Sequence, residues 1–477
     1  MSLLLISLTL LVLTVTAVTF WKNYKLKALL HPGFAFCLLW IIVITSYYLF
    51  ADLMGLGTIF DPKAMNELHS FVLFSGLFFL LAQRFGRSNV LKHDSSWDVS
   101  EFSAMFTLLA IICFLLSMYN FIRQGGSLNF LMMRQRMVML SSMRYNGEIS
   151  FSRVDTLIGI ANNLNSALAI FAGYYLARYH FSGHLIPSRI RFLPLILPLF
   201  AYIFTMLAVG GRNDFIIGCR QYFFGVAIAF GCSKEIAFSV EFRKFVRYAL
   251  ILLVAFLIYS NFSHQQRMDS GGAGESVEWS EAPMLLRPFS STISYLSSSM
   301  MGYQHRRNDY ATEDDLSWGE KTFSGILFWA PPLTGALGQQ FTIGKMFGME
   351  QYVMKDVFLE LQSEKADYFC AVFPIYLLMY ADFGYWGTVL LSLIFVLLTQ
   401  WVFCWWFGHS HRYFIAAFLP LVFFWLWSNS IFPPVFAVGL PKQFLYSLVL
   451  CDLLLYFYRH RKSRETISEE PLVVHIS

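Results

Sequence analysis

Two arginines beside apolar runs offer the first possible chemistry in this sequence. The stretch Val209-Gly210-Gly211-Arg212-Asn213-Asp214 lies between the apolar runs Phe192–Ala208 and Phe215–Gly231, and the second run contains Arg220. A Gly-Gly turn leaves backbone N–H groups pointing outward, and a helix N-terminus beside a guanidinium forms an anion site. Arg220 falls roughly 10 Å below the start of its helix, where an arginine usually faces a polar cavity. The residues predict an anion site at membrane level. The alternative is a plain turn whose Arg212 extends to the interface.

A second basic cluster lies between residues 123 and 155. It contains five arginines but only two acids, and its middle, Leu128–Met143, has no Pro or Gly and is rich in Met and Leu. This pattern predicts an amphipathic helix lying on the membrane surface. Its guanidinium groups either grip a specific anionic lipid substrate or simply hold anionic headgroups. The arginines are Arg123, Arg134, Arg136, Arg144 and Arg153.

Three side chains are candidates for a general base. His264 follows an apolar run directly, His305 lies in Gln304-His305-Arg306-Arg307, and Asp382 lies at an apolar boundary. Each could take the proton of an attacking hydroxyl group. The ordinary alternatives are surface histidines and a carboxylate that caps the following helix. The residues leave this choice open.

The composition is that of a polytopic membrane protein. Of 477 residues, 57% are hydrophobic and only 14% are charged, whereas a soluble domain carries about 25% charged residues. The basic residues lie in short clusters between apolar runs, so the net charge of +5 does not indicate nucleic-acid binding. The seven cysteines show no zinc-type or C-x-x-C spacing, and we expect neither a metal nor a cofactor.

Charge asymmetry sets the expected topology. Lys22, Lys25 and Lys27 follow the first apolar run with no acids nearby, so this loop is expected inside and the N-terminus outside. We predict an all-α protein with about eleven membrane helices, within a range of ten to fourteen. The expected helices are Ser2–Phe20, Phe34–Phe50, Leu68–Gln83, Phe102–Ile122, Thr156–Tyr175, Phe192–Ala208, Phe215–Gly231, Tyr248–Phe262, Tyr385–Phe407, Tyr413–Ile431 and Val435–Tyr458.

Four regions follow from this topology. Residues 1–262 are expected to form helices one to eight with the basic outer loop 123–155, and residues 263–369 a large periplasmic loop with short helices. Residues 370–464 are expected to hold a re-entrant or surface half-helix, Ala371–Tyr380, and the last crossings. Residues 465–477 form a cytoplasmic tail. Internal repeats, which many transporters have, are not evident.

The unusual charged residues converge on the outer face of this topology. Many arginines around a membrane-level cavity suit a pyrophosphate group on a lipid tail. No nucleotide-binding motif is evident, so a reaction there needs an activated substrate such as a polyprenyl-pyrophosphate sugar. Asp214 has its own alternative, an ion pair with Arg212 or Arg220. The candidate substrate-binding residues are Arg134, Arg136, Arg144, Arg212, Asp214, Arg220, Arg267, Arg306, Tyr380 and Lys442.

The layout resembles the O-antigen and oligosaccharide repeat-unit polymerases of the Wzy type. The resemblance rests on Gly210-Gly211-Arg212, on the long late loop, and on Tyr380-Ala381-Asp382-Phe383-Gly384-Tyr385-Trp386-Gly387. Arg136 followed by Gly147 is similar to the arginine-x10-glycine pattern of some members, although the long loop has no second copy.

The resemblance implies a metal-independent glycosyltransferase of the C type in the bacterial inner membrane, with its site facing the periplasm. It would move a growing glycan from undecaprenyl pyrophosphate to the non-reducing end of an incoming lipid-linked repeat unit, with inversion. A polysaccharide chain-length regulator is an implied partner. The alternatives are an O-antigen ligase, which the sequence scarcely separates from a polymerase, and a flippase for lipid-linked oligosaccharide.

Overall fold

A computed structural model describes six long stretches of the chain and a set of shorter pieces. The long stretches are 3–50, 61–85, 103–126, 153–181, 192–209 and 374–409. The shorter pieces are 132, 136, 139, 218–219, 221–226, 229, 247, 250–251, 254, 297, 299–304, 307, 316, 318–319, 321–323, 327, 346–347, 359–362, 367–370 and 427.

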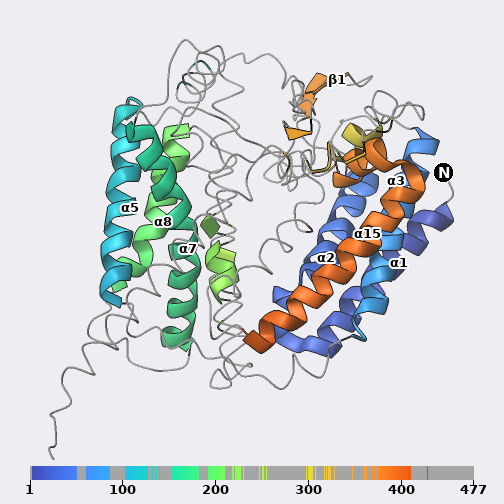
Figure 1. The fold of residues 1–477 in the computed structure, drawn as a ribbon, viewed down its shortest axis with the longest axis horizontal. Coiled ribbons are helices and arrows are strands. Elements are labelled where there is room, and N and C mark those ends of the chain that lie inside the picture. Colours follow the sequence, from blue (N-terminus) through green and yellow to red (C-terminus); the bar gives the residue numbers. More distant parts are fainter. Residues whose placement is uncertain are drawn as a thin grey trace, which may run out of the picture.

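The long helices form two groups, which lie on opposite sides of the molecule in Figure 1. The first group contains α1 (Leu3–Tyr24), α2 (Pro32–Thr45), α3 (Pro62–Ala82) and α15 (Ile375–His409), and the second contains α5 (Ser103–Arg123), α7 (Arg153–Phe181) and α8 (Phe192–Val209). A 3-10 helix, η1 (Lys25–Leu30), joins α1 to α2, and a π-helical turn, η2 (Ser46–Phe50), follows α2. Although α15 is far from the other three helices in sequence, it packs directly against α3.

Five of the described helices are long and apolar enough to cross a membrane. They are Leu3–Tyr24, Pro32–Leu49, Pro62–Ala82, Phe106–Arg123 and Ile375–Trp405, and α8 has a shorter apolar stretch. The chain therefore has the architecture of a helical membrane protein. The first six expected helices are confirmed as helices within a few residues of their predicted bounds. The full count of about eleven crossings and the large periplasmic loop stay predictions.

Short polar caps explain where two of these helices begin. Asp61 precedes Pro62, and its carboxylate accepts hydrogen bonds from the backbone N–H groups of Lys63 and Ala64 at 2.8 and 3.2 Å. His31 precedes Pro32, and its Nδ1 accepts a hydrogen bond from the backbone N–H of Gly33 at 3.0 Å. Proline suits the first helical position because that N–H has no partner within the helix.

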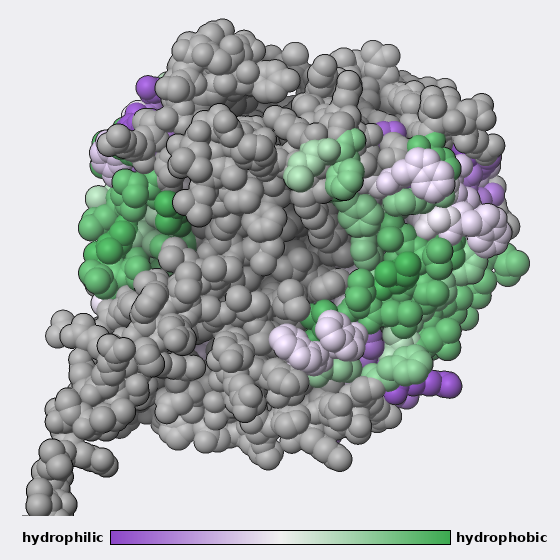
Figure 2. Space-filling view, viewed as in Figure 1, coloured by the Kyte–Doolittle hydropathy of each residue, from purple (hydrophilic) through white to green (hydrophobic). Residues whose placement is uncertain are grey.

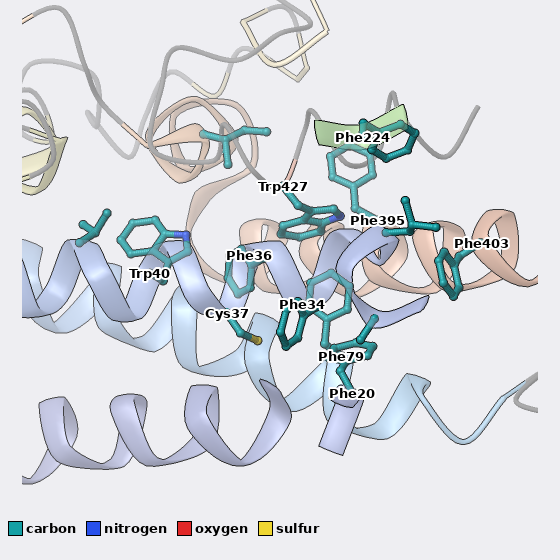
Figure 3. Packing of buried hydrophobic residues seen from close by; sticks show 14 of the residues in the cluster. Phe20, Phe34, Phe36, Cys37, Trp40, Phe79, Phe224, Phe395, Phe403 and Trp427 are labelled. Atoms are coloured by element: carbon teal, nitrogen blue, oxygen red, sulfur yellow. The ribbon is translucent and has the colours of Figure 1, made fainter. Parts of the chain in front are cut away.

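Helices α1, α3 and α15 run parallel, and α2 runs against them. Near one end of the bundle, Phe71 of α3 contacts Tyr380 of α15 at a ring separation of 6.2 Å. Near the other end, the Phe85 carbonyl accepts a hydrogen bond from Gln400 at 2.8 Å. The interior between these levels is aromatic, and Figure 3 shows part of that cluster. Its labelled members include Phe20, Phe34, Phe36, Trp40, Phe79, Phe224, Phe395, Phe403 and Trp427.

An exposed apolar stripe runs along α15 on the C-terminal side of its first three turns. Trp386, Leu390, Ile394, Leu397 and Trp401 recur every three or four residues, and each of these residues is between 43% and 75% exposed. This spacing places them on one face of the helix. Figure 2 shows hydrophobic residues gathered over this side of the molecule, with more hydrophilic residues toward both ends. We expect this stripe to be the face that α15 presents to lipid, because α15 is long and apolar enough to cross a membrane.

The second helix group is held by hydrogen bonds between its helices. Asn165 Nδ2 of α7 donates to the Pro198 carbonyl of α8 at 2.9 Å, and Thr205 donates to Asn162 at 3.3 Å. These asparagines therefore join neighbouring helices through hydrogen bonds. The Tyr222 hydroxyl bonds to the α8 backbone near Pro198. It donates a hydrogen bond to the Leu195 carbonyl and accepts one from the Leu199 N–H. Residues 221–226 thereby join α8.

One short element departs from an all-helical fold. Strands β1 (Leu359–Gln362) and β2 (Asp367–Cys370) pair in an antiparallel register that places Leu359 opposite Cys370. They lie at the end of the segment for which the sequence indicated short helices. The hairpin leads into α15, and the other described elements are helices or turns.

Candidate functional site

Helix α15 is broken inside the stretch Tyr380–Gly387 that the sequence singled out. Gly384 has φ 66° and ψ −170°, whereas its neighbours are helical. Residues with a Cβ essentially avoid this backbone region, so the break requires glycine. Non-helical backbone at membrane depth is tolerated where protein or a water-filled cavity surrounds it. Helix is present on both sides of Gly384, close to the boundary expected between Ala371–Tyr380 and Tyr385–Phe407. The re-entrant or surface placement of the first piece stays a prediction.

Asp382 fastens part of the hydrophilic segment 263–369 to this break. Its carboxylate is fully buried and accepts the backbone N–H of Lys321 at 3.2 Å and that of Thr322 at 2.6 Å. Its own carbonyl accepts the N–H of Trp318 at 3.2 Å. Both carboxylate oxygens are therefore used by the protein itself. This geometry favours a positioning role for Asp382 over the expected role as a base, which stays a prediction.

The residues held by Asp382 begin a helical turn. The N–H of Phe323 donates to the Gly319 carbonyl and the N–H of Leu327 donates to the Phe323 carbonyl, both at 2.9 Å. The carboxylate from α15 thus caps a helix start in another segment, because the first N–H groups of a helix lack partners. Gly319 has φ 95° and lies against Phe383, which a Cβ at Gly319 would meet at 3.1 Å. The turn sits directly on the break.

Tyr380 fastens a second part of the same hydrophilic segment. Its hydroxyl accepts a hydrogen bond from Arg307 Nη2 at 3.0 Å. Arg307 also forms a bidentate pair with Glu67 of α3, with Nε–Oε2 and Nη2–Oε1 both at 2.8 Å. The two side chains are only 8% and 14% exposed. A planar guanidinium matches a carboxylate in this two-bond geometry, so the pair fixes both position and orientation.

The described residues of the range 297–307, which are 297, 299–304 and 307, therefore lie across one end of the first helix group. Gln304 Nε2 donates to the Tyr47 hydroxyl at 3.1 Å, and Gln304 Oε1 accepts the Asp61 N–H at 2.8 Å. Tyr303 is fully buried, its hydroxyl has no partner within the described residues, and burial raises its pKa well above the ordinary value. Glu67, Arg307 and Tyr303 define a cluster that we call the Arg307 cluster.

A second polar network closes the opposite end of the same bundle. His31 Nε2 lies 3.0 Å from Gln400 Oε1, and Gln400 Nε2 donates to the Tyr24 hydroxyl at 3.1 Å. That hydroxyl donates to the Gln83 carbonyl at 3.2 Å. Burial lowers the pKa of the His31 imidazole to about 3, so the ring is neutral at physiological pH. Glu67 and Gln83 are sixteen residues apart on one helix, which separates the two polar levels by about 24 Å.

Three of the expected site residues lie within the described part of the chain. Asp382 and Tyr380 are brought together at the break, as described above. Arg136 is elsewhere: its Nη1 donates to the Gln124 carbonyl at 2.8 Å, just past the end of α5. It thus satisfies a carbonyl at a helix C-terminus. Its expected part in substrate binding stays a prediction.

The other expected site residues lie outside the described residues. They are His264, His305, Arg134, Arg144, Arg212, Asp214, Arg220, Arg267, Arg306 and Lys442. Sequence reasoning missed the pairing of Glu67 with Arg307, although an acid inside the run that became α3 was a usable signal. An ionisable residue within a membrane helix has, by default, a specific partner.

Comparison with known proteins adds no relative. The chain matches no protein-family model, no curated protein and no solved structure. Fold and site by themselves define a helical membrane protein whose broken helix α15 anchors a long hydrophilic segment at one end of a four-helix group.

Proposed function

We propose that this chain is a membrane glycosyltransferase that polymerises lipid-linked oligosaccharide repeat units. The observation that supports the proposal is the break in α15, where Tyr380 and Asp382 hold two separate parts of the hydrophilic segment 263–369. An enzyme acting on a lipid-linked substrate needs polar residues fixed at the ends of its membrane helices. Rigid placement of this kind is what catalytic geometry requires.

The proposed reaction occurs on the periplasmic side of a bacterial inner membrane. A hydroxyl of the incoming lipid-linked repeat unit attacks the anomeric carbon of the growing glycan, and a new C–O bond forms. The bond from that carbon to undecaprenyl pyrophosphate breaks, and its electron pair leaves with the pyrophosphate. The hydroxyl proton goes to a general base, for which His264, His305 and Asp382 are the candidates. Inversion at the anomeric carbon is expected.

The arginines take separate roles in this proposal. Arg212 and Arg220 stabilise the leaving pyrophosphate, and Arg134 and Arg136 hold the second lipid or the glycan. Arg307 is not assigned to the pyrophosphate, because its guanidinium already pairs with Glu67 through two hydrogen bonds. It acts instead on the placement of residues 297–307.

The test is the lipopolysaccharide of a strain that lacks this gene, separated on a gel. Core carrying a single repeat unit, restored to a ladder by the wild-type gene but not by Arg212→Ala, supports the polymerase. Arg84→Ala is the matched control, because Arg84 is an exposed arginine just past the end of α3 that lies far from Glu67. This variant should restore the ladder. Each variant is first checked for membrane insertion.

Other outcomes assign other functions. Bare core with lipid-linked polymer accumulating indicates an O-antigen ligase. Bare core with undecorated carrier trapped inside indicates a flippase. An unchanged ladder in the deletion strain contradicts the proposed function. A normal ladder with Arg212→Ala contradicts the role of that arginine.

A further inference from the structure

Trp318 is an exposed indole held in an unusual backbone conformation. Its side chain is 75% exposed and its φ is 47°, in the left-handed region that a bulky residue seldom adopts. The hydrogen bond from its N–H to the Asp382 carbonyl and the capped turn that follows hold it there. Strain of this kind persists where the surrounding structure fixes it and is concentrated at functional positions.

The hydrogen bond from the Trp318 N–H to the Asp382 carbonyl fixes the position of Trp318 along the length of α15. Asp382 lies four residues before Trp386, on the other side of the break at Gly384. The lipid-facing stripe begins at Trp386 and ends at Trp401. Tryptophan is enriched at both membrane–water interfaces because its ring is apolar and its N–H is polar. Trp386 and Trp401 are fifteen residues apart, or about 22 Å along the continuous part of α15, and Asp382 lies farther on, beyond the break at Gly384. Asp382 and Trp401 are therefore separated by most of the roughly 30 Å hydrocarbon core of a bilayer.

The other end of this span has independent interface markers. Gln400, next to Trp401, bonds to Tyr24 of α1. Trp21 and Lys22, one turn before Tyr24, are both exposed. Tryptophan and lysine together mark a membrane boundary. If Trp401 lies at this membrane boundary, Trp318 lies at the level of the opposite membrane boundary.

We propose that Trp318 is a membrane anchor, with its indole in the headgroup region of the leaflet next to the Arg307 cluster. The ligand of this surface is the phospholipid interface itself. The anchor fixes the turn that Asp382 caps, and through α15 it keeps the Arg307–Glu67 pair at the depth of lipid phosphates. The inference does not depend on the proposed enzymatic function.

The surrounding sequence indicates which lipids suit this surface. Glu313, Asp314, Asp315 and Glu320 flank Trp318, with Lys321 beside them. This net negative charge is repelled by anionic headgroups, so the partner is a zwitterionic interface. A sugar ring stacked on the exposed indole is the competing partner. The position of Trp318 at the end of a lipid-facing stripe favours lipid.

The test uses the full chain in nanodiscs of phosphatidylcholine, without any glycan present. Tryptophan emission is compared between ordinary lipid and lipid brominated close to the headgroup, because bromine quenches only nearby indoles. Three variants are measured beside the wild type: Trp318→Phe, Trp386→Phe as an exposed reference on the stripe, and Trp40→Phe as a fully buried reference.

The expected result is that Trp318→Phe removes emission that shallow bromine quenches, by a share similar to that in Trp386→Phe. The emission removed by Trp40→Phe should be insensitive to bromine. The proposal is overturned if the emission lost with Trp318→Phe is unaffected by brominated lipid yet quenched by aqueous iodide, the behaviour of an indole available to a glycan. If Trp318→Phe fails to fold, Trp318→Tyr retains an amphipathic ring and is assessed by the same two quenchers.

Discussion

Cutting the pair between Arg307 and Glu67 should release residues 297–307 without unfolding the bundle. In Arg307→Met the Glu67 carboxylate, 14% exposed, loses both of its 2.8 Å bonds, and Tyr380 loses its hydrogen bond from the guanidinium. Removing one partner of a buried pair costs about 3–5 kcal/mol, and the residual exposure of Glu67 favours the lower figure. A cost of about 3 kcal/mol corresponds to roughly a hundredfold rise in local opening.

Hydrogen exchange of the purified protein, read by mass spectrometry, measures this opening directly. We expect exchange in residues 297–307 to accelerate about a hundredfold in Arg307→Met. Amides in the middle of α3 should be unchanged.

Arg123→Met is the matched control. Arg123 makes a single 3.0 Å contact with Asp155 and is 32% exposed, so its loss costs less than about 1 kcal/mol. Glu67→Leu combined with Arg307→Met should recover part of the protection, because both charges are then absent. Equal acceleration around Arg123 and Arg307 in their respective variants would refute the reasoning.

Two further predictions concern the break and the opposite end of the bundle. Gly384→Ala should lower stability by about 1–3 kcal/mol in denaturant unfolding, while Gly159→Ala, whose added methyl meets nothing within 4 Å, should be neutral or slightly stabilising. Below pH 6.5 the unfolded chain binds a proton at His31 that the folded chain does not bind until about pH 3, so stability should fall as pH drops through this window, by up to about 1.4 kcal/mol per unit. His31→Asn keeps a helix-capping oxygen and should remove this contribution; an unchanged pH slope of the unfolding free energy would contradict it.

The helices and the break could be predicted because their causes are local. Long uncharged runs bounded by lysines and arginines specify membrane helices without knowledge of their neighbours. The interruption of an apolar run by Asp382-Phe383-Gly384 was likewise visible, and the structure places the junction at Gly384. Local patterns of this kind carry their own physical explanation.

The partners of charged residues could not be predicted in the same way. Arg306 was expected at the site, but Arg307 makes the contacts with Glu67 and Tyr380. Successive residues of a helix point about 100° apart, so the choice between neighbours depends on the helix phase. In a polar segment no hydrophobic periodicity sets that phase.

Polar residues inside apolar runs were similarly ambiguous. Gln400 gives no sign in sequence that it will bond to Tyr24, His31 and the Phe85 carbonyl, all more than three hundred residues earlier. Burial without such bonds is expensive, so partners must exist, but the sequence does not name them.

The distance in sequence between Gln83 and Gln400 has a consequence for synthesis. At 5–20 residues per second, roughly 15–60 s separate the emergence of these two glutamines from the ribosome. During that interval α1, α2 and α3 are made but lack the helix whose glutamine joins Tyr24 to His31. The early helices must therefore wait in the bilayer with an incomplete polar network. A chain truncated before α15 should accordingly be a substrate for quality-control proteases even though its first three helices can insert.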